Sequence, residues 1–194
     1  MKPHTRRRFL RNSLSAAAAP AIIPAHLLGA DAPSNKITVG FIGVGGHGSG
    51  WNLPSYLQQK DARVLAVCDV DETHLGRAKK TVDIQYGNKD CATTKDFREV
   101  LARDDIDAVM ISTPDHWHTL MSVMAMRAGK DVQCEKPTLS IDEGKILIET
   151  ARSTKKVFQT STEDRAIPVY HRMAELVRNG RIGKLERIEV ILPK

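Results

Sequence analysis

Cysteine is scarce in this 194-residue sequence, with Cys68, Cys91 and Cys134 as its three thiols. They lie far apart, and none belongs to a Cys-x-x-Cys pair or to a cluster of histidine and cysteine with metal-ligand spacing. A disulfide framework and a zinc site are therefore not implied, and we predict no metal. Cys68 and Cys134 each end a short apolar run, where a thiol behaves as a small apolar side chain.

Basic runs interleaved with aromatic residues are absent beyond residue 32. The net charge of +6 suggests an acidic partner at first sight, but the first 32 residues carry five of the 29 basic residues and one of the 23 acidic ones. The remaining charges are close to balanced and evenly spread. We therefore expect no nucleic-acid partner.

A long uninterrupted apolar run is also missing. The apolar residues 14–28 contain Pro20 and Pro24 and fall short of the roughly 20 residues of a membrane span. They follow the basic residues 5–11 and precede the small residues 30–32, an order typical of a twin-arginine export signal. A basic amphipathic helix is disfavoured by the two prolines. We predict that residues 1–32 are this signal, that the twin-arginine translocation machinery is a partner, and that the mature protein is soluble and periplasmic.

From residue 37 short apolar runs alternate with helical patterns, which is typical of βαβ units. The expected strands are 37–42, 64–68, 108–112, 131–134 and 157–160, with a weaker one around Cys91. This predicts an α/β fold, a doubly wound parallel sheet of the Rossmann type over residues 33–160. After residue 160 a helix over 168–178 and a strand over 185–192 predict the beginning of an α+β substrate domain, 161–194, which continues beyond this chain.

Two helices are expected between the strands, and each has an apolar face. The expected helices are 94–102 and 140–151, and the second starts with a capping-box pattern at Ser140 and Glu143. The residues expected to share one face are Phe97, Val100 and Leu101 in the first helix and Ile141, Gly144, Ile148 and Ala151 in the second.

A glycine-rich loop directly follows the first expected strand. Gly43, Gly45, Gly46 and Gly48 satisfy G-x-G-x-x-G, and Asp69 ends the next strand 21 residues later. Glycine lets the backbone turn sharply and approach a pyrophosphate, whose charge the helix N-terminus favours. A carboxylate at Asp69 accepts hydrogen bonds from ribose hydroxyls and repels a 2′-phosphate, so we predict NAD in preference to NADP. The alternative for the loop is a purely structural glycine turn. The alternative for Asp69 is the cap of the following helix, a role that Asp71 fits better.

Two further strand ends carry polar residues. Thr113-Pro114 and His118 follow the strand 108–112, and Glu135-Lys136 follow the strand 131–134. In an open parallel sheet, ligands bind outside the carboxyl ends of the strands. These residues are therefore candidates for the same site as the glycine loop. A solvated loop lysine and a first-turn helix histidine are the plain alternatives for Lys136 and His118.

Together these motifs resemble the Gfo/Idh/MocA oxidoreductase family, which includes glucose-fructose oxidoreductase and inositol dehydrogenase. The resemblance rests on GxGGxG, Cys-Asp-Val-Asp at 68–71, Thr-Pro-x-x-x-His at 113–118 and Glu-Lys-Pro at 135–137. It implies that Lys136 is catalytic and lies beside the nicotinamide, and that Glu135 holds the cofactor's ribose. It also implies that Thr113, Pro114 and His118 lie along the cofactor and that the bond before the Glu-Lys-Pro proline is cis.

The function that the resemblance implies is hydride transfer between NAD and a hydroxyl of a sugar, sugar acid or cyclitol. Two alternatives stay open: a glycoside-cleaving enzyme that uses NAD transiently, which the presence of Lys136 disfavours, and a non-catalytic cofactor-binding module. The family's proton-accepting residues lie beyond Lys194, so we expect this chain to be inactive alone. A homo-oligomer is expected for the full-length protein.

Overall fold

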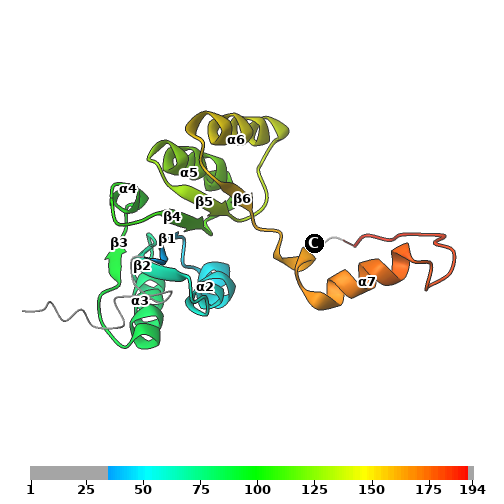
Figure 1. Cartoon of the computed structure of the whole chain (residues 1–194), viewed down its shortest axis with the longest axis horizontal. Coiled ribbons are helices and arrows are strands. Elements are labelled where there is room, and N and C mark those ends of the chain that lie inside the picture. The colour runs from blue at the N-terminus through cyan, green and yellow to red at the C-terminus, as the bar shows by residue number, and fades with distance from the viewer. Residues whose placement is uncertain (1–34, 192–194) are drawn as a thin grey trace, which may run out of the picture. The chain divides into compact units, whose positions relative to one another are not determined.

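The computed structural model describes residues 35–191, which form a six-stranded, entirely parallel sheet (Figure 1). The strand order is β3-β2-β1-β4-β5-β6, so the chain reverses its direction of growth between β1 and β4. This is the doubly wound order of a dinucleotide-binding fold, and it confirms the predicted fold class. The strands are β1 (Ile37–Ile42), β2 (Ala62–Cys68), β3 (Ala92–Thr94), β4 (Ala108–Ile111), β5 (Asp131–Cys134) and β6 (Phe158–Thr160).

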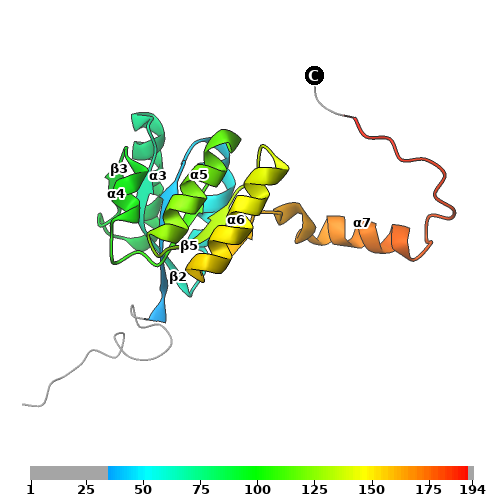
Figure 2. The same ribbon diagram turned by 90° about the horizontal axis from the view of Figure 1, so that it is seen from above.

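Helices cover both faces of the sheet (Figures 1 and 2). One apolar cluster packs side chains of α4, α5 and α6 against the strands, and a second packs those of α2 and α3 against the other face. The helices are η3, a π-helical turn (Gly48–Asn52), α2 (Leu53–Leu57), α3 (Glu72–Tyr86), α4 (Phe97–Leu101), α5 (Asp115–Arg127), α6 (Ile141–Thr154), η4, a 3-10 turn (Glu163–Arg165), and α7 (Pro168–Arg178).

The central strands are apolar on both faces because both faces are covered. In β4, Val109 and Ile111 belong to the cluster beneath α4, α5 and α6, whereas Met110 belongs to the other. Successive side chains of a strand point to opposite faces, so this alternation is what a strand between two helical layers requires. The sheet therefore has an apolar core on each face, and its polar residues gather in the loops at the strand ends.

Short polar side chains define where the helices begin. Asp71 caps α3, since its carboxylate accepts hydrogen bonds from the backbone N–H groups of Thr73 and His74 at 2.7 and 3.0 Å. This confirms the capping role expected for Asp71 and leaves Asp69 free for another one. Ser140 likewise caps α6 through the N–H of Glu143 at 3.2 Å. These hydrogen bonds fix the residue at which each helix begins, and with it the end of the loop that leads into the helix.

Several expected elements differ from the structure. Strand β3 reaches Thr94, and Asp96 caps α4, so the helix expected over 94–102 is shorter. The buried residues of α6 are Leu147 and Thr150, whereas Ile141 and Ile148 of the expected apolar face are exposed. Residues 185–191 form no strand, so the strand expected over 185–192 was also wrong over its described part.

The compact unit that contains the sheet begins at Ile37. The export signal expected over 1–32 lies outside the described residues. None of the residues of α7 is fully buried, and its apolar side chains, Val169, Met173 and Val177, are exposed. Within residues 35–191, the structure has no helix long and apolar enough to cross a membrane.

Candidate functional site: a dinucleotide pocket at the strand ends

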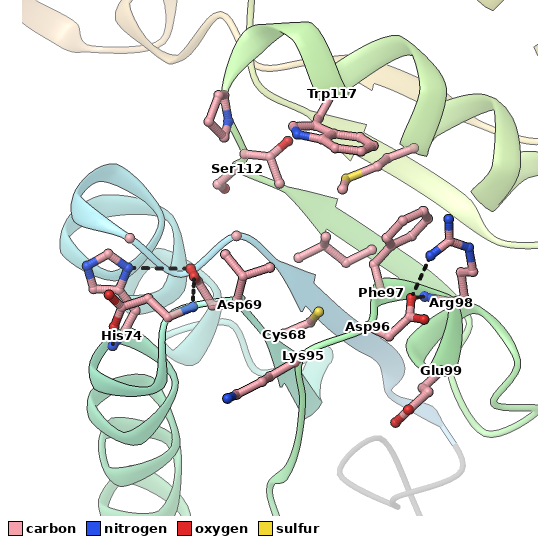
Figure 3. Close-up of a pocket in the computed structure, with 18 of the residues that line it drawn as sticks. Cys68, Asp69, His74, Lys95, Asp96, Phe97, Arg98, Glu99, Ser112 and Trp117 are labelled. Atoms are coloured by element: carbon pink, nitrogen blue, oxygen red, sulfur yellow. Dashed lines mark hydrogen bonds and ion pairs between the residues drawn. The ribbon is translucent and has the colours of Figure 1, made fainter.

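A pocket of about 880 Å³ opens at the carboxyl ends of β1, β2 and β4 (Figure 3). It lies at the point where the sheet reverses its strand order, where ligands bind in folds of this kind. Its lining includes six of the residues predicted from the sequence, namely Gly43, Gly45, Gly46, Asp69, Thr113 and Pro114. The structure therefore brings together the glycine loop, the acidic strand end and the Thr-Pro loop, which are up to 71 residues apart in the chain.

The four loop glycines fall into two groups. Gly43 has a φ of +84°, and a Cβ there would lie 2.7 Å from the Ser112 carbonyl carbon, while a Cβ on Gly48 would lie 2.3 Å from the Gly43 oxygen. These two glycines are required by the fold itself. A Cβ on Gly46 would meet no atom within 4 Å, and one on Gly45 would be in ordinary contact with His74. Glycine at these two positions leaves open space beside the backbone on the pocket side, as the close approach of a pyrophosphate needs.

Asp69 connects the end of β2 to the glycine loop. One carboxylate oxygen accepts a hydrogen bond from the N–H of Val44 at 2.8 Å, and the other accepts from the N–H of Asp71 at 3.0 Å. The His74 ring is 3.6 Å from the same carboxylate (Figure 3). The carboxylate is thus held at the pocket edge by three partners: Val44 of the glycine loop, Asp71 of the turn after β2, and His74 of α3. His74 was not expected at the site from the sequence.

The opposite wall of the pocket is apolar. Phe97, Trp117 and Met121 line it, and Trp117 comes from α5 on the far side of the pocket from Asp69 (Figure 3). The cations at the rim are paired: Arg98 lies 3.2 Å from Asp96, and Lys95 contacts Glu72. An apolar wall facing a carboxylate suits a flat ring joined to a hydroxyl-bearing sugar. No functional role was predicted for Trp117 from the sequence.

Thr113 supplies a polar atom that the protein leaves unused. Its hydroxyl oxygen is buried and has no hydrogen-bond partner among the described residues. A buried hydroxyl without a partner costs free energy, about 1–3 kcal/mol, unless a ligand or water satisfies it. Thr113 also lines the pocket, so a rotation of its side chain would turn the hydroxyl toward a polar ligand group.

Glu135 and Lys136 lie outside this pocket, at the end of β5. The Glu135 side chain is 8% exposed, and one of its oxygens accepts a hydrogen bond from Asn52 at 2.8 Å. Asn52 also donates to Ser112 at 2.9 Å, which ties the ends of β4 and β5 together. Lys136 is exposed, and its ammonium group makes no hydrogen bond or ion pair with the described residues. The Lys136–Pro137 bond is cis, which confirms the expectation.

His47 approaches two carboxylates. Its Nε2 atom is 3.3 Å from Glu135 and 3.4 Å from Glu163, a residue of η4. We call these three residues the His47 cluster. Their ligand atoms are close enough to hold a metal ion, but His47 is half exposed and Glu135 already has a partner in Asn52. The absence of a metal therefore stays a prediction.

His118 is placed differently from the other predicted residues. Its side chain is buried, and its two ring nitrogens face the backbone oxygens of Pro137 and Thr113. No ring nitrogen is left to meet a ligand. A direct contact of His118 with a cofactor therefore stays a prediction, while the structure shows a contact that joins two loops.

The buried thiols belong to the core. Burial raises the pKa of both the Cys68 thiol and the Cys134 thiol to about 12, so both remain protonated at neutral pH. All three cysteines are free and buried. The burial of Cys68 and Cys134 confirms that these two thiols act as small apolar side chains. Two carboxyls that line the pocket, Asp71 and Asp96, have a lowered pKa, because backbone N–H groups of His74 and Thr73 stabilise the charge of the first and that of Arg98 stabilises the second.

These features define a class of protein. A glycine loop with open space beside it, an acidic residue at the end of the second strand, an unpaired hydroxyl and an apolar wall together fit a dinucleotide. The chain is thus an α/β protein with the cofactor site of a Rossmann-fold oxidoreductase.

The comparisons agree with this class. The chain belongs to the Gfo/Idh/MocA family, because the model of that family matches residues 37–162. The family is described as "Oxidoreductase family, NAD-binding Rossmann fold". A curated relative, a glycosyl hydrolase family 109 protein of Saccharopolyspora erythraea, is 38% identical over 124 residues, which are 62% of this chain and 27% of the relative. The family makes NAD the cofactor class of this site.

Solved structures show the same fold with a cofactor bound. The scyllo-inositol dehydrogenase of Lactobacillus casei with NAD(H) and scyllo-inositol superposes with a TM-score of 0.65 at 27% identity, over 76% of this chain and 42% of that one. The 3-ketoreductase KijD10 of Actinomadura kijaniata, in complex with NADP and TDP-benzene, has a TM-score of 0.65 at 26% identity, over 75% of this chain and 43% of that one. The chain spans less than half the length of these proteins.

Some residues of the site were missed by sequence reasoning. Asn52 lies in a helical stretch whose period gave no reason to single it out, and its role follows from burial between Ser112 and Glu135. Glu163 is brought to His47 only by the course of the chain after β6. A buried asparagine and a glutamate just after the last strand are signals that could have been noted, but neither has a fixed spacing to a known motif.

Proposed function

We propose that this chain forms the cofactor-binding part of an enzyme that transfers hydride between NAD and a hydroxyl-bearing carbon of a sugar, sugar acid or cyclitol. The observation that carries the proposal is the pocket in which Gly46, Asp69 and the unpaired Thr113 hydroxyl meet. The inositol dehydrogenase with bound NAD(H) and scyllo-inositol supports the substrate class.

Different residues of the site would hold different parts of the cofactor. The open backbone at Gly45 and Gly46 would take the pyrophosphate, and Asp69 would accept hydrogen bonds from the adenosine ribose. Trp117 provides a flat apolar surface on the opposite wall. Glu135, which lies outside this pocket at the end of β5, would hold the second ribose. NAD is preferred over NADP because the Asp69 carboxylate repels a 2′-phosphate.

Lys136 is the proposed catalytic residue. Its ammonium group is exposed beside Glu135, without a partner among the described residues that would hold it away from a substrate. An ammonium group next to a reacting hydroxyl stabilises the negative charge that develops on oxygen as its proton leaves. When bound, NAD supplies the carbon that accepts the hydride. The group that accepts the proton is proposed to lie in a substrate domain, of which residues 161–194 form the beginning.

Glycoside cleavage through transient oxidation is the second candidate. It is favoured by the 38% identical relative that is named a glycosyl hydrolase family 109 protein. Net oxidation and transient oxidation need the same cofactor pocket but leave different products. Both reactions begin with the oxidation of an alcohol, whose oxyanion Lys136 can stabilise in either case, so the products rather than this residue distinguish them.

We also propose that residues 1–32 direct export through the twin-arginine machinery to the periplasm and that the natural enzyme is a homo-oligomer. The charged, apolar and small-residue regions of that segment support the export proposal. A fusion of residues 1–32 to a reporter protein tests it, since replacing Arg6, Arg7 and Arg8 with lysine should abolish export. Export of the lysine variant would contradict the proposal.

The test of the catalytic proposal is Lys136→Ala in the natural enzyme, with Lys60→Ala as a matched control at another exposed lysine. With NAD and scyllo-inositol or myo-inositol as probes, Lys136→Ala should lower NADH formation by about 100-fold or more while the Kd for NAD changes little. Unchanged turnover would refute the role of Lys136. Release of the phenol from a nitrophenyl glycoside without net NADH would favour the second candidate.

A further inference from the structure

His118 occupies an unusual place between two of the strand-end loops. It lies in the first turn of α5 and is 3% exposed. Its Nδ1 atom is 2.9 Å from the Pro137 oxygen, and its Nε2 atom is 2.8 Å from the Thr113 oxygen. Both distances are those of hydrogen bonds to backbone oxygens. One ring thus spans the loop after β4 and the loop after β5.

The chemistry of the ring limits what it can do. A carbonyl oxygen only accepts, so each contact needs an N–H on the ring nitrogen that makes it. A neutral imidazole donates to one of the two loops, and a doubly protonated one donates to both. In either state the ring nitrogens face protein atoms, so His118 has no nitrogen with which to act on a substrate directly.

The two loops carry different parts of the site. The loop after β4 brings Thr113 and Pro114 to the pocket, and the loop after β5 carries Glu135 and Lys136. The backbone ladder between the strands ends with the bond from the Glu135 N–H to the Ile111 oxygen at 2.9 Å. Beyond that point side chains join the loops.

Within residues 35–191 we describe two such connections, made by Asn52 and by His118. Asn52 bridges Ser112 and Glu135, and His118 bridges Thr113 and Pro137, one residue further along the first loop and two along the second. Of the two bridges, that of His118 holds the residue that directly follows Lys136. The position of the Lys136 backbone relative to the pocket therefore depends on this ring.

We propose that His118 is a positioning residue that fixes the separation of the Thr113 and Lys136 loops, and so places Lys136 relative to a cofactor held in the pocket. The proposal rests on the proposed function for its consequence but on the two ring contacts for its geometry. In this role His118 joins the two loops through its ring nitrogens and does not contact the substrate.

Two substitutions separate the two contacts. The amide nitrogen of asparagine takes the place of Nδ1, and that of glutamine takes the place of Nε2. His118→Asn therefore keeps the bond to Pro137 and loses that to Thr113, whereas His118→Gln does the reverse. The probes are ADP-ribose, which lacks nicotinamide, and NADH, whose fluorescence on binding reports the surroundings of the nicotinamide.

His118→Gln should bind ADP-ribose within about twofold of the unaltered protein, but should lose most of the rise in NADH fluorescence. His118→Asn should bind ADP-ribose about fivefold to tenfold more weakly, the effect of losing about one hydrogen bond, and should keep the NADH fluorescence of the molecules that bind. A variant that was merely destabilised would lose both signals together. Equal effects of the two substitutions on both probes would overturn the proposal.

A measurement on the unaltered protein covers the case in which a variant does not fold. Scalar coupling across a hydrogen bond, between a ring ¹⁵N of His118 and the ¹³C carbonyl of Thr113 or Pro137, should be detected by NMR. Absence of coupling to both carbonyls would overturn the proposal. If neither ADP-ribose nor NADH binds the unaltered protein while coupling is present, the proposed function fails and the link made by His118 stands.

Discussion

Replacing Gly46 with alanine should weaken cofactor binding without weakening the fold. Residue 46 is helical, and a Cβ there would meet no atom within 4 Å. Alanine in place of glycine at such a position stabilises a protein by about 0.5 kcal/mol, chiefly by restricting the unfolded chain. The added methyl group faces the pocket, however, where the pyrophosphate must approach the backbone. The Kd for NAD should therefore rise about tenfold or more, which is about 1.4 kcal/mol.

Gly50 provides the matched control, because a Cβ on it would also meet no atom within 4 Å, but it does not line the pocket. Gly50→Ala should leave the Kd for NAD unchanged. Gly43→Ala should destabilise the fold by about 3 kcal/mol, since alanine at a φ of +84° would also clash with the Ser112 backbone. Calorimetry with NAD and thermal denaturation measure the two effects. If Gly46→Ala bound NAD as tightly as Gly50→Ala, the assignment of the pyrophosphate to this loop would be refuted.

Three further results are expected. Asp69→Asn should weaken NAD binding about tenfold and raise the affinity for NADP relative to NAD, because the repulsion of a 2′-phosphate is removed; calorimetry that shows an unchanged ratio would contradict this. The raised pKa values of Cys68 and Cys134 mean that the folded state holds these protons more tightly, so their contribution is complete below the unfolded pKa of about 8.5–9 and is lost as the pH rises toward 12. The urea midpoint should accordingly fall between pH 9 and pH 11, and a flat profile would argue against it. Treatment with EDTA should leave the Kd for NAD unchanged, and restoration of binding by Zn²⁺ or Mn²⁺ would instead assign a metal to the His47 cluster.

Much of the fold follows from local patterns in the sequence. The bounds of β1, β5 and α7 agree with the expected residues, because each is a short apolar or amphipathic run between clear turn signals. The limits of α4 were less predictable, since Thr94 pairs with Cys68 in the sheet and Asp96 provides the cap. The residues 185–191 have strand-like composition but no strand partner in the described chain. Pairing is a tertiary property that composition does not determine.

Some residues of the candidate site could likewise be predicted from the sequence, and others could not. Gly43, Gly46 and Asp69 could be predicted because their chemistry requires a fixed spacing along one βαβ unit. Asn52 and His74 could not, since they reach the site by side-chain contacts between segments that are distant in the sequence or lie on the next helix. His118 was found by its motif, but whether its ring faced a ligand or the protein depended on two backbone oxygens that only the folded loops bring to it.

The order of the strands has a mechanical consequence. Strand β1 pairs with β2 on one side and with β4 on the other, so the two halves of the sheet meet along the seam between β1 and β4. A dinucleotide in contact with the loops after β1 and β4 crosses this seam and acts as a reversible cross-link between the halves. At a free concentration one hundred times its Kd, such a ligand adds about 2.7 kcal/mol to the free energy of unfolding. The cofactor would in this way stabilise the folded domain in addition to taking part in its chemistry.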